Sequence, residues 1–218
     1  TFFVGQTQNA FQVAAVSLTN PVFVLFIAAA NLLGIGGSAM ISILLGQNKK
    51  EKVKSVSSFC CYASIIIGIL SCLLILIFMN PLLKLLGSSP DTYQFSKDYL
   101  FYIALGGPFI LFSNAFGHIV RGEGASNISM IGGLIGTIVN IILDPIFILT
   151  LNMGTAGAAI ATVIGNIAGC LYYLWYFNKG ESSLSLNPCY LAGEKKIMLQ
   201  TTNIGIPSGI NSALMSVS

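Results

Sequence analysis

Long apolar runs separated by short polar stretches form the basic pattern of this chain. The main apolar runs cover residues 11–45, 56–79, 100–120, 128–149 and 156–177. Each run is long enough to cross the hydrocarbon core of a bilayer as a helix, because about 20 residues suffice. The pattern therefore predicts five complete membrane-spanning helices.

Two shorter apolar segments flank these five. Residues 1–5 resemble the end of a helix, and residues 197 onward resemble the start of another, so we expect a fragment of a longer chain. The run 11–45 is too long for one straight span and predicts a tilted or kinked helix. Gly106-Gly107-Pro108 is expected to interrupt the run 100–120, and residues 81–99 are expected to form an amphipathic return.

Composition and charge assign the chain to the membrane and predict its orientation. Hydrophobic residues make up 55% of the chain and charged residues only 8%, whereas soluble domains average about 25% charged residues. Counted over alternate loops, eight Lys and Arg residues lie on one side and two on the other. Since cytoplasmic loops carry the excess of positive charge, we expect the loops 46–55, 121–127 and 178–196 in the cytoplasm.

The strongest candidate for chemistry is Asp144, near the middle of the run 128–149. A charge at that depth is costly unless it is paired, solvated or protonated. Asn140 lies one helical turn earlier on the same face, and Pro145 leaves the carbonyl of Ile141 without its helical partner. These oxygens predict a small site for a proton or a cation such as Na⁺. The alternative is a structural carboxyl that holds two helices together.

Further polar residues in the spans are weaker candidates. Thr162 follows a run of small residues on the next helix and, like Asn166, is also explained by close helix packing. Asn114 lies on the run 100–120 and Tyr99 directly before it; buried polar groups at such positions often bond neighbouring helices. His118 is expected at the cytoplasmic interface without a role. The turn Arg121-Gly-Glu-Gly is expected to contain a local ion pair of little energetic weight.

Several classes of enzyme are excluded. An intramembrane aspartyl protease needs two acids, and Asp144 is the one acid deep in a span. Serine or metal chemistry needs more than the single His of this chain. No glycine-rich motif has the spacing of an ATP-binding loop. We therefore expect no enzyme, no cofactor other than a possible bound Na⁺, and no nucleic-acid partner; an ion gradient would supply the energy for transport.

Several stretches together resemble the multidrug and toxic compound extrusion (MATE) family. They are Phe3-Val4-Gly5, Ser42-x-x-Leu45-Gly46-Gln47, Arg121-Gly-Glu-Gly124, Asn140-Ile-Ile-Leu-Asp144-Pro145 and Gly154-x-x-Gly157-Ala-Ala-x-Ala161-Thr162. The resemblance covers essentially the whole chain. The Asn-x-x-x-Asp-Pro and Gly-Ala-Ala-x-Ala-Thr stretches, in this order, are its most specific part.

This resemblance implies an all-α, polytopic transmembrane helical bundle, one six-helix lobe of a twelve-helix, two-lobe transporter. Residues 1–177 would form the first lobe with an incomplete helix 1, residues 178–196 the cytoplasmic interlobe loop, and residues 197–218 the start of helix 7. Family members sit in the cell membrane and exchange organic cations or drugs for H⁺ or Na⁺.

The resemblance also assigns the site residues. Asp144 and Asn140 on helix 5 and Thr162 on helix 6 would hold the cation or proton, supported by Asn114 and Tyr99 on helix 4. The family's acidic residue on helix 1 would precede Thr1, so it lies outside this sequence, as do the acidic residues of the second lobe.

Two other functions compete with export. A lipid-linked oligosaccharide flippase shares the general architecture, but it is expected to carry more Arg and Lys toward its cavity. A membrane scaffold or receptor without turnover would use Asp144 structurally, and no ion gradient would affect its ligand.

Overall fold

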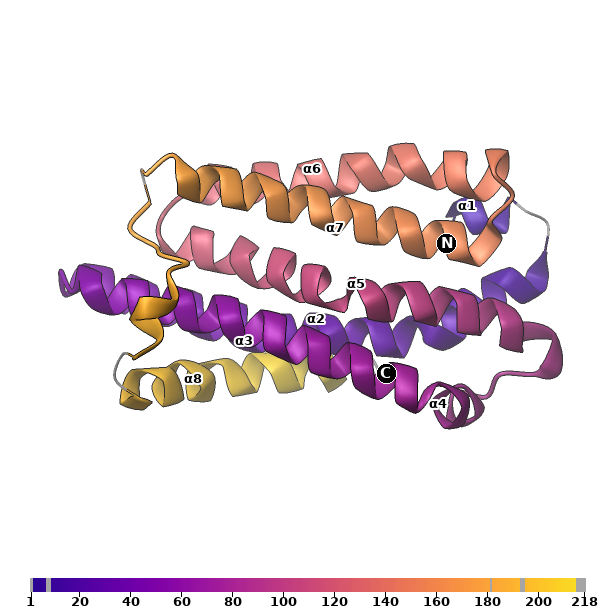
Figure 1. The fold of residues 1–218 in the computed structure, drawn as a ribbon, viewed down its shortest axis with the longest axis horizontal. Coiled ribbons are helices and arrows are strands. Elements are labelled where there is room, and N and C mark those ends of the chain that lie inside the picture. The colour runs from indigo at the N-terminus through magenta and orange to yellow at the C-terminus, as the bar shows by residue number, and fades with distance from the viewer. Residues whose placement is uncertain (1, 7–8, 181, 193–194, 215–218) are drawn as a thin grey trace.

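The computed structural model describes residues 2–6, 9–180, 182–192 and 195–214, which form an elongated bundle of helices (Figure 1). The elements are α1 (Phe2–Gly5), α2 (Ala10–Gly46), α3 (Lys50–Ile77), α4 (Met79–Leu85), α5 (Pro90–Gly122), α6 (Ser126–Pro145), the π-helix η1 (Ile146–Thr150), α7 (Gly154–Asn178), the 3₁₀ helix η2 (Pro188–Ala192) and α8 (Lys195–Leu214). No strand occurs within these ranges. The all-α prediction is confirmed.

Five of these helices are long and apolar enough to cross a membrane: α2, α3, α5, α6 with η1, and α7. They match the five spans expected from the sequence. Large apolar side chains remain exposed along them, such as Leu74, Ile138 and Leu171. A soluble protein rarely leaves so much apolar surface open, so the chain is a multi-pass membrane protein with lipid-facing helices.

Two connections between helices are shorter than predicted, because the helices that follow them begin earlier in the sequence than the charged residues indicated. Residues 47–49 alone connect α2 to α3, so Lys50, Lys52 and Lys54 lie in the first turns of a span. Likewise the amphipathic return is only the seven-residue α4, and α5 begins at Pro90. Ser89 and Thr92 form a reciprocal capping box there, and Pro90 occupies the first helical position, a strong start signal.

The Gly106-Gly107-Pro108 sequence does not interrupt its helix; α5 continues through it. The glycines serve packing instead. A Cβ on Gly106 would lie 2.2 Å from Val163 Cγ2 of α7, and one on Gly107 would lie 2.7 Å from Phe26 Cε1 of α2. Glycine lets helices approach this closely in a membrane, so α5 is held against both neighbours.

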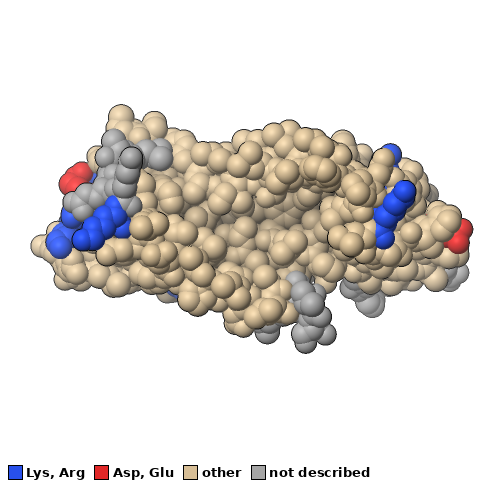
Figure 2. Space-filling model, turned by 90° about the horizontal axis from the view of Figure 1, so that it is seen from below, with Lys and Arg blue, Asp and Glu red and all other residues tan. Residues whose placement is uncertain are grey.

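The positively charged loops gather at one end of the bundle, where α2, α5 and α7 end and α3, α6 and α8 begin (Figure 1). The face seen in Figure 2 is uncharged along its middle, with charged side chains only near its ends. The lysine-rich loops thus share one end, as expected. Which end faces the cytoplasm stays a prediction.

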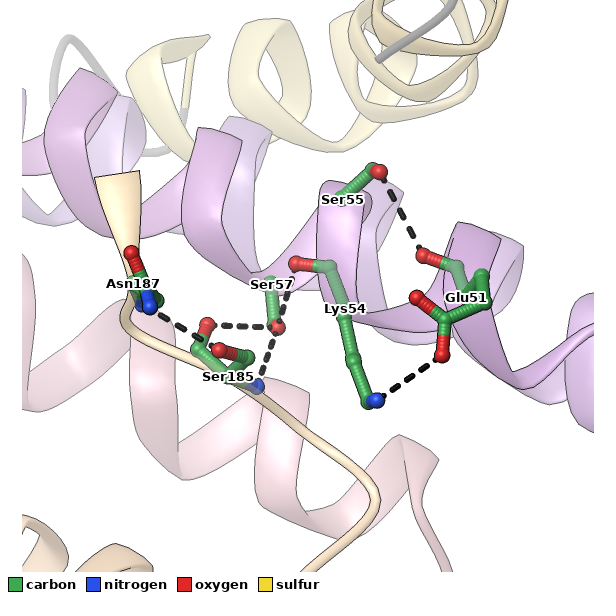
Figure 3. Close-up of polar contacts among 6 residues, drawn as sticks. All are labelled: Glu51, Lys54, Ser55, Ser57, Ser185 and Asn187. Atoms are coloured by element: carbon green, nitrogen blue, oxygen red, sulfur yellow. Dashed lines mark hydrogen bonds and ion pairs between the residues drawn. The ribbon is translucent and has the colours of Figure 1, made fainter. Parts of the chain in front are cut away.

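The connection between α7 and α8 is bound tightly across this end. Ser57 Oγ of α3 accepts from Ser185 N at 2.9 Å and donates to Ser185 O at 2.8 Å (Figure 3). Glu123 accepts hydrogen bonds from Ser182 Oγ at 2.8 and 3.0 Å and from Ser183 N. The linker is therefore fastened both to α3 and to the α5–α6 turn.

The prediction of an ion pair between Arg121 and Glu123 is wrong. Both residues lie in the described part of the chain, and they do not bind each other there. Arg121 Nη2 donates to Ser129 Oγ at 3.3 Å, while Glu123 takes the linker donors. Tyr176 also donates to Glu123 Oε2 at 3.3 Å. The turn is thus an anchor for the linker.

Candidate functional site

Asp144 lies in the last turn of α6, directly before Pro145 and the π-helical turn η1. Its side chain is half-buried, and its Oδ1 atom is shielded without a hydrogen-bond partner among the described residues. Leaving a carboxylate oxygen buried and unpaired costs free energy. Inside a membrane bundle such a group usually marks an ion or proton pathway. Local π-helical turns are also frequent at functional sites.

Asn140 and Thr162 meet across the α6–α7 interface. Asn140 Nδ2 donates to Thr162 Oγ1 at 3.3 Å, and Thr162 Oγ1 donates to the carbonyl of Ala158 at 2.9 Å. This contact requires two glycines, because a Cβ on Gly165 would lie 2.6 Å from the carbonyl oxygen of Gly136. The small residues of the two helices therefore bring these two predicted ligands together.

Asp144 has no hydrogen bond to either of these two residues, although it lies one turn from Asn140 on α6. Tyr99 of α5 packs against an apolar cluster that includes Ile148 of η1, the turn that follows Asp144 and Pro145. Asn114 belongs to another part of the site: it donates to the Ile110 carbonyl at 2.8 Å and to Asn166 Oδ1 at 3.5 Å. The structure thus brings Asn140 and Thr162 into contact, with Tyr99 beside the turn that follows Asp144 and Asn114 further along.

A pocket of about 390 Å³ opens between α5, α6 and α7. Its polar lining includes Asn114, Thr137, Asn140, Thr162 and Asn166. Asn166 donates to the Thr162 carbonyl at 2.8 Å, so the amides of α5 and α7 join the Asn140–Thr162 contact into one polar wall. The size is typical of small-molecule sites. Asp144 is not among the described lining residues but lies one turn beyond Asn140.

His118 also lines this pocket, which the sequence reasoning missed. Its Nε2 atom lies 3.2 Å from Asn31 Oδ1 of α2, and Asn31 Nδ2 donates to Ser212 Oγ of α8 at 2.9 Å. These bonds form a polar bridge from the pocket through α2 to α8. A signal was present in the sequence, since Asn31 is an amide deep within a long apolar run. Its partners, however, lie 87 and 181 residues away along the chain.

Comparison with known proteins identifies the fold and the family. The MatE family model matches residues 1–146. The chain belongs to the MatE family. Multidrug export protein MepA of Staphylococcus aureus strain MSSA476 is 36% identical over 98% of the chain, and that of Staphylococcus haemolyticus is 36% identical over 99%. The chain spans about half the length of these curated relatives, 48% of each.

Solved MATE structures have the same fold. One, described as the inward-facing conformation of a multidrug resistance MATE transporter, superposes with a TM-score of 0.90 at 31% identity, covering 95% of this chain and 47% of that one. A second, described as the outward-facing conformation, gives 0.91 at 29% identity, covering 99% and 48%. The MatE assignment confirms the resemblance found in the sequence, and the names of these relatives describe transporters rather than enzymes.

Proposed function

We propose that the full-length protein is a secondary-active exporter that exchanges organic, cationic compounds for H⁺ or Na⁺. The observation that carries this proposal is the shielded Asp144 Oδ1 atom, which has no hydrogen-bond partner among the described residues and lies one turn from the Asn140–Thr162 contact and its pocket. The names of the staphylococcal relatives, multidrug export proteins, support the same activity.

The pocket and the carboxylate have separate roles in this mechanism. The organic compound occupies the space between α5, α6 and α7, where amide and hydroxyl groups and Tyr173 supply hydrogen bonds and an aromatic wall. The coupling ion binds at Asp144. Arg121 lines the pocket, and none of its described lining residues is acidic. The negative charge that attracts a cationic compound therefore comes from the Asp144 carboxylate, one turn beyond Asn140, until the ion neutralises it.

Exchange requires that the ion and the exported compound favour opposite conformations, since a ligand shifts an equilibrium only through its differential affinity. We infer that a second lobe completes the transporter and that the two lobes move against each other as nearly rigid bodies. The similar TM-scores of this half against an inward-facing and an outward-facing relative support this inference. The order of events in the transport cycle follows. Binding of the coupling ion at Asp144 drives the organic compound out of the pocket, and release of the ion restores the affinity of the pocket for the next compound.

The two candidate ions make different demands on the site. A proton needs only the Asp144 oxygen, because low dielectric favours the neutral acid. A Na⁺ ion needs several hard oxygen ligands, here the carboxylate with the Asn140 amide oxygen and the Thr162 hydroxyl. Thr162 Oγ1 now accepts from Asn140 and donates to Ala158, so Na⁺ would have to rearrange this contact and a proton would not.

Asp144→Asn in the full-length protein tests the proposal. This variant keeps the size of the side chain but mimics permanent protonation, so export of an organic cation driven by imposed H⁺ or Na⁺ gradients should be abolished in proteoliposomes. Gradient-driven export at the wild-type rate by correctly inserted Asp144→Asn protein would overturn the mechanism. It would also favour the scaffold alternative, in which Asp144 is structural.

Thr162→Val then distinguishes the ions, because it removes the hydroxyl at nearly constant volume. It should abolish export driven by Na⁺ but reduce H⁺-driven export only modestly. Thr202→Val is the matched control: Thr202 lies on α8 outside the lining of the pocket, and its hydroxyl donates to the Met198 carbonyl of its own helix, at 3.0 Å. Equal effects of the two valine variants under a Na⁺ gradient would exclude Thr162 as a ligand.

A further inference from the structure

A second pocket, of about 630 Å³, lies at the lysine-rich end of the bundle, away from the export site. It is formed where the last turns of α2, the start of α3 and the first half of α8 meet. The two pockets share no lining residue. The second pocket therefore needs an explanation of its own.

The lining of this pocket combines apolar surface with positive charge. Met40, Leu44 and Ile204 contribute apolar surface, and Lys49, Lys52 and Lys196 bring three ammonium groups. None of the described residues that line it is acidic. The acid closest in sequence, Glu51, binds Lys54 Nζ at 2.9 Å, outside this lining. An anionic ligand with an apolar part complements such a surface.

The position of the pocket along the spans narrows the choice of ligand. It lies at the end of the membrane-crossing helices α2 and α3, where the apolar sequence gives way to lysines. At this level a bilayer offers phosphate headgroups directly above acyl chains. Basic pockets between transmembrane helices on the cytoplasmic side are suited to acidic lipid headgroups.

We propose that this pocket binds an acidic phospholipid, with its phosphate among Lys49, Lys52 and Lys196 and an acyl chain along the apolar surface of α2 and α8. The lipid then contacts α2, α3 and α8 at once. α8 already packs directly on α2: Asn31 Nδ2 donates to Ser212 Oγ at 2.9 Å, and a Cβ on Gly209 would lie 3.1 Å from Leu32 Cβ. The lipid adds a further contact between these helices at the lysine-rich end. The bound lipid strengthens the packing of α8 on α2.

The test measures lipid binding to the purified full-length protein in detergent, by native mass spectrometry with phosphatidylglycerol and, in parallel, phosphatidylcholine. The test variant carries Lys49→Gln, Lys52→Gln and Lys196→Gln. Its matched control carries Lys50→Gln, Lys54→Gln and Lys179→Gln, which removes the same charge at the same end without touching the lining.

Phosphatidylglycerol should bind the wild type and the control variant with similar affinity and should bind better than phosphatidylcholine. Each lysine removed from the pocket should weaken phosphatidylglycerol binding about fivefold. If the triple variant fails to fold, the three single lysine substitutions measure the same loss of phosphatidylglycerol affinity one residue at a time. Equal weakening in both triple variants would mean that general surface charge attracts the lipid, and would overturn the proposal. Inorganic phosphate binding as tightly as phosphatidylglycerol would also overturn it, since the site would then take a free anion.

Discussion

Glu123 shows how one side chain can set the role of a turn. Its carboxylate receives donors from Ser182, Ser183 and Tyr176, which lie on the linker and on α7. Hydrogen bonds to a charged group are stronger than neutral ones by about 1 kcal/mol. At this residue the linker between α7 and α8 is tied to the α5–α6 turn.

Glu123→Gln should therefore loosen the linker. The amide keeps the size of the side chain but replaces one acceptor oxygen with a donor nitrogen, so part of this set of hydrogen bonds is lost. Limited proteolysis should cut between residues 182 and 192 several times faster than in the wild type, with normal membrane insertion. Asp91→Asn is the control, because Asp91 is exposed in the first turn of α5, at the opposite end of the bundle from the linker. Equal cleavage of both variants would contradict the anchoring role.

Some site residues could be found from sequence and others could not. Asp144 stands out because an acid within an apolar run is costly wherever the helix packs. Asn140 follows from helical spacing alone. The hydrogen bonds of His118 and Asn31, by contrast, depend on how α2 packs against α5. The sequence of a single helix does not tell which neighbouring helix will pack against a given polar side chain.

At the scale of the elements, the α6–α7 contact holds the site together. Gly165→Ala should lower the stability of the protein by about 1–3 kcal/mol, as overpacking does. The added methyl group would lie 2.6 Å from the Gly136 carbonyl oxygen, which is backbone and cannot rotate away. The two helices would have to separate, which breaks the 3.3 Å contact between Asn140 and Thr162. Thermal unfolding in detergent measures the loss.

Gly133→Ala is the control on the same helix. A Cβ at Gly133 meets nothing within 4 Å, and alanine favours a helix over glycine by up to about 1 kcal/mol. Its melting temperature should equal or exceed that of the wild type. If Gly165→Ala has the same melting temperature as the Gly133→Ala control, the close approach of α6 and α7 does not stabilise the fold.

The helices themselves could be predicted well, and their ends less well. All five spans follow from the length of the apolar runs. The start of α3 at Lys50 was missed because charged residues were assigned to a loop, although lysine is a good helix former. Gly106 and Gly107 were read as an interruption because their partners, Val163 and Phe26, become visible only in the packed bundle.

At the scale of the whole molecule, the charge asymmetry predicts which end faces the cytoplasm. The described lysines 49, 50, 52, 54, 179 and 196 and Arg121 lie at one end, whereas Lys84 and Lys97 lie toward the other. The linker lies across the lysine-rich end through Ser57 and Glu123. Since positive loops stay in the cytoplasm, the linker should be intracellular.

The native Cys189 tests this orientation directly. It is exposed on the linker, whereas Cys60, Cys61 and Cys170 are buried and Cys72 lies within α3. An impermeant thiol reagent should leave Cys189 unlabelled in intact cells and label it once the membrane is permeabilised; Cys189→Ser identifies the signal. Asp91→Cys, an exposed position at the opposite end, should be labelled in intact cells when introduced into the Cys189→Ser protein. Labelling of native Cys189 in intact cells, together with protection of Asp91→Cys until permeabilisation, would invert the topology. The acidic-lipid pocket at the lysine-rich end would then face the outer leaflet.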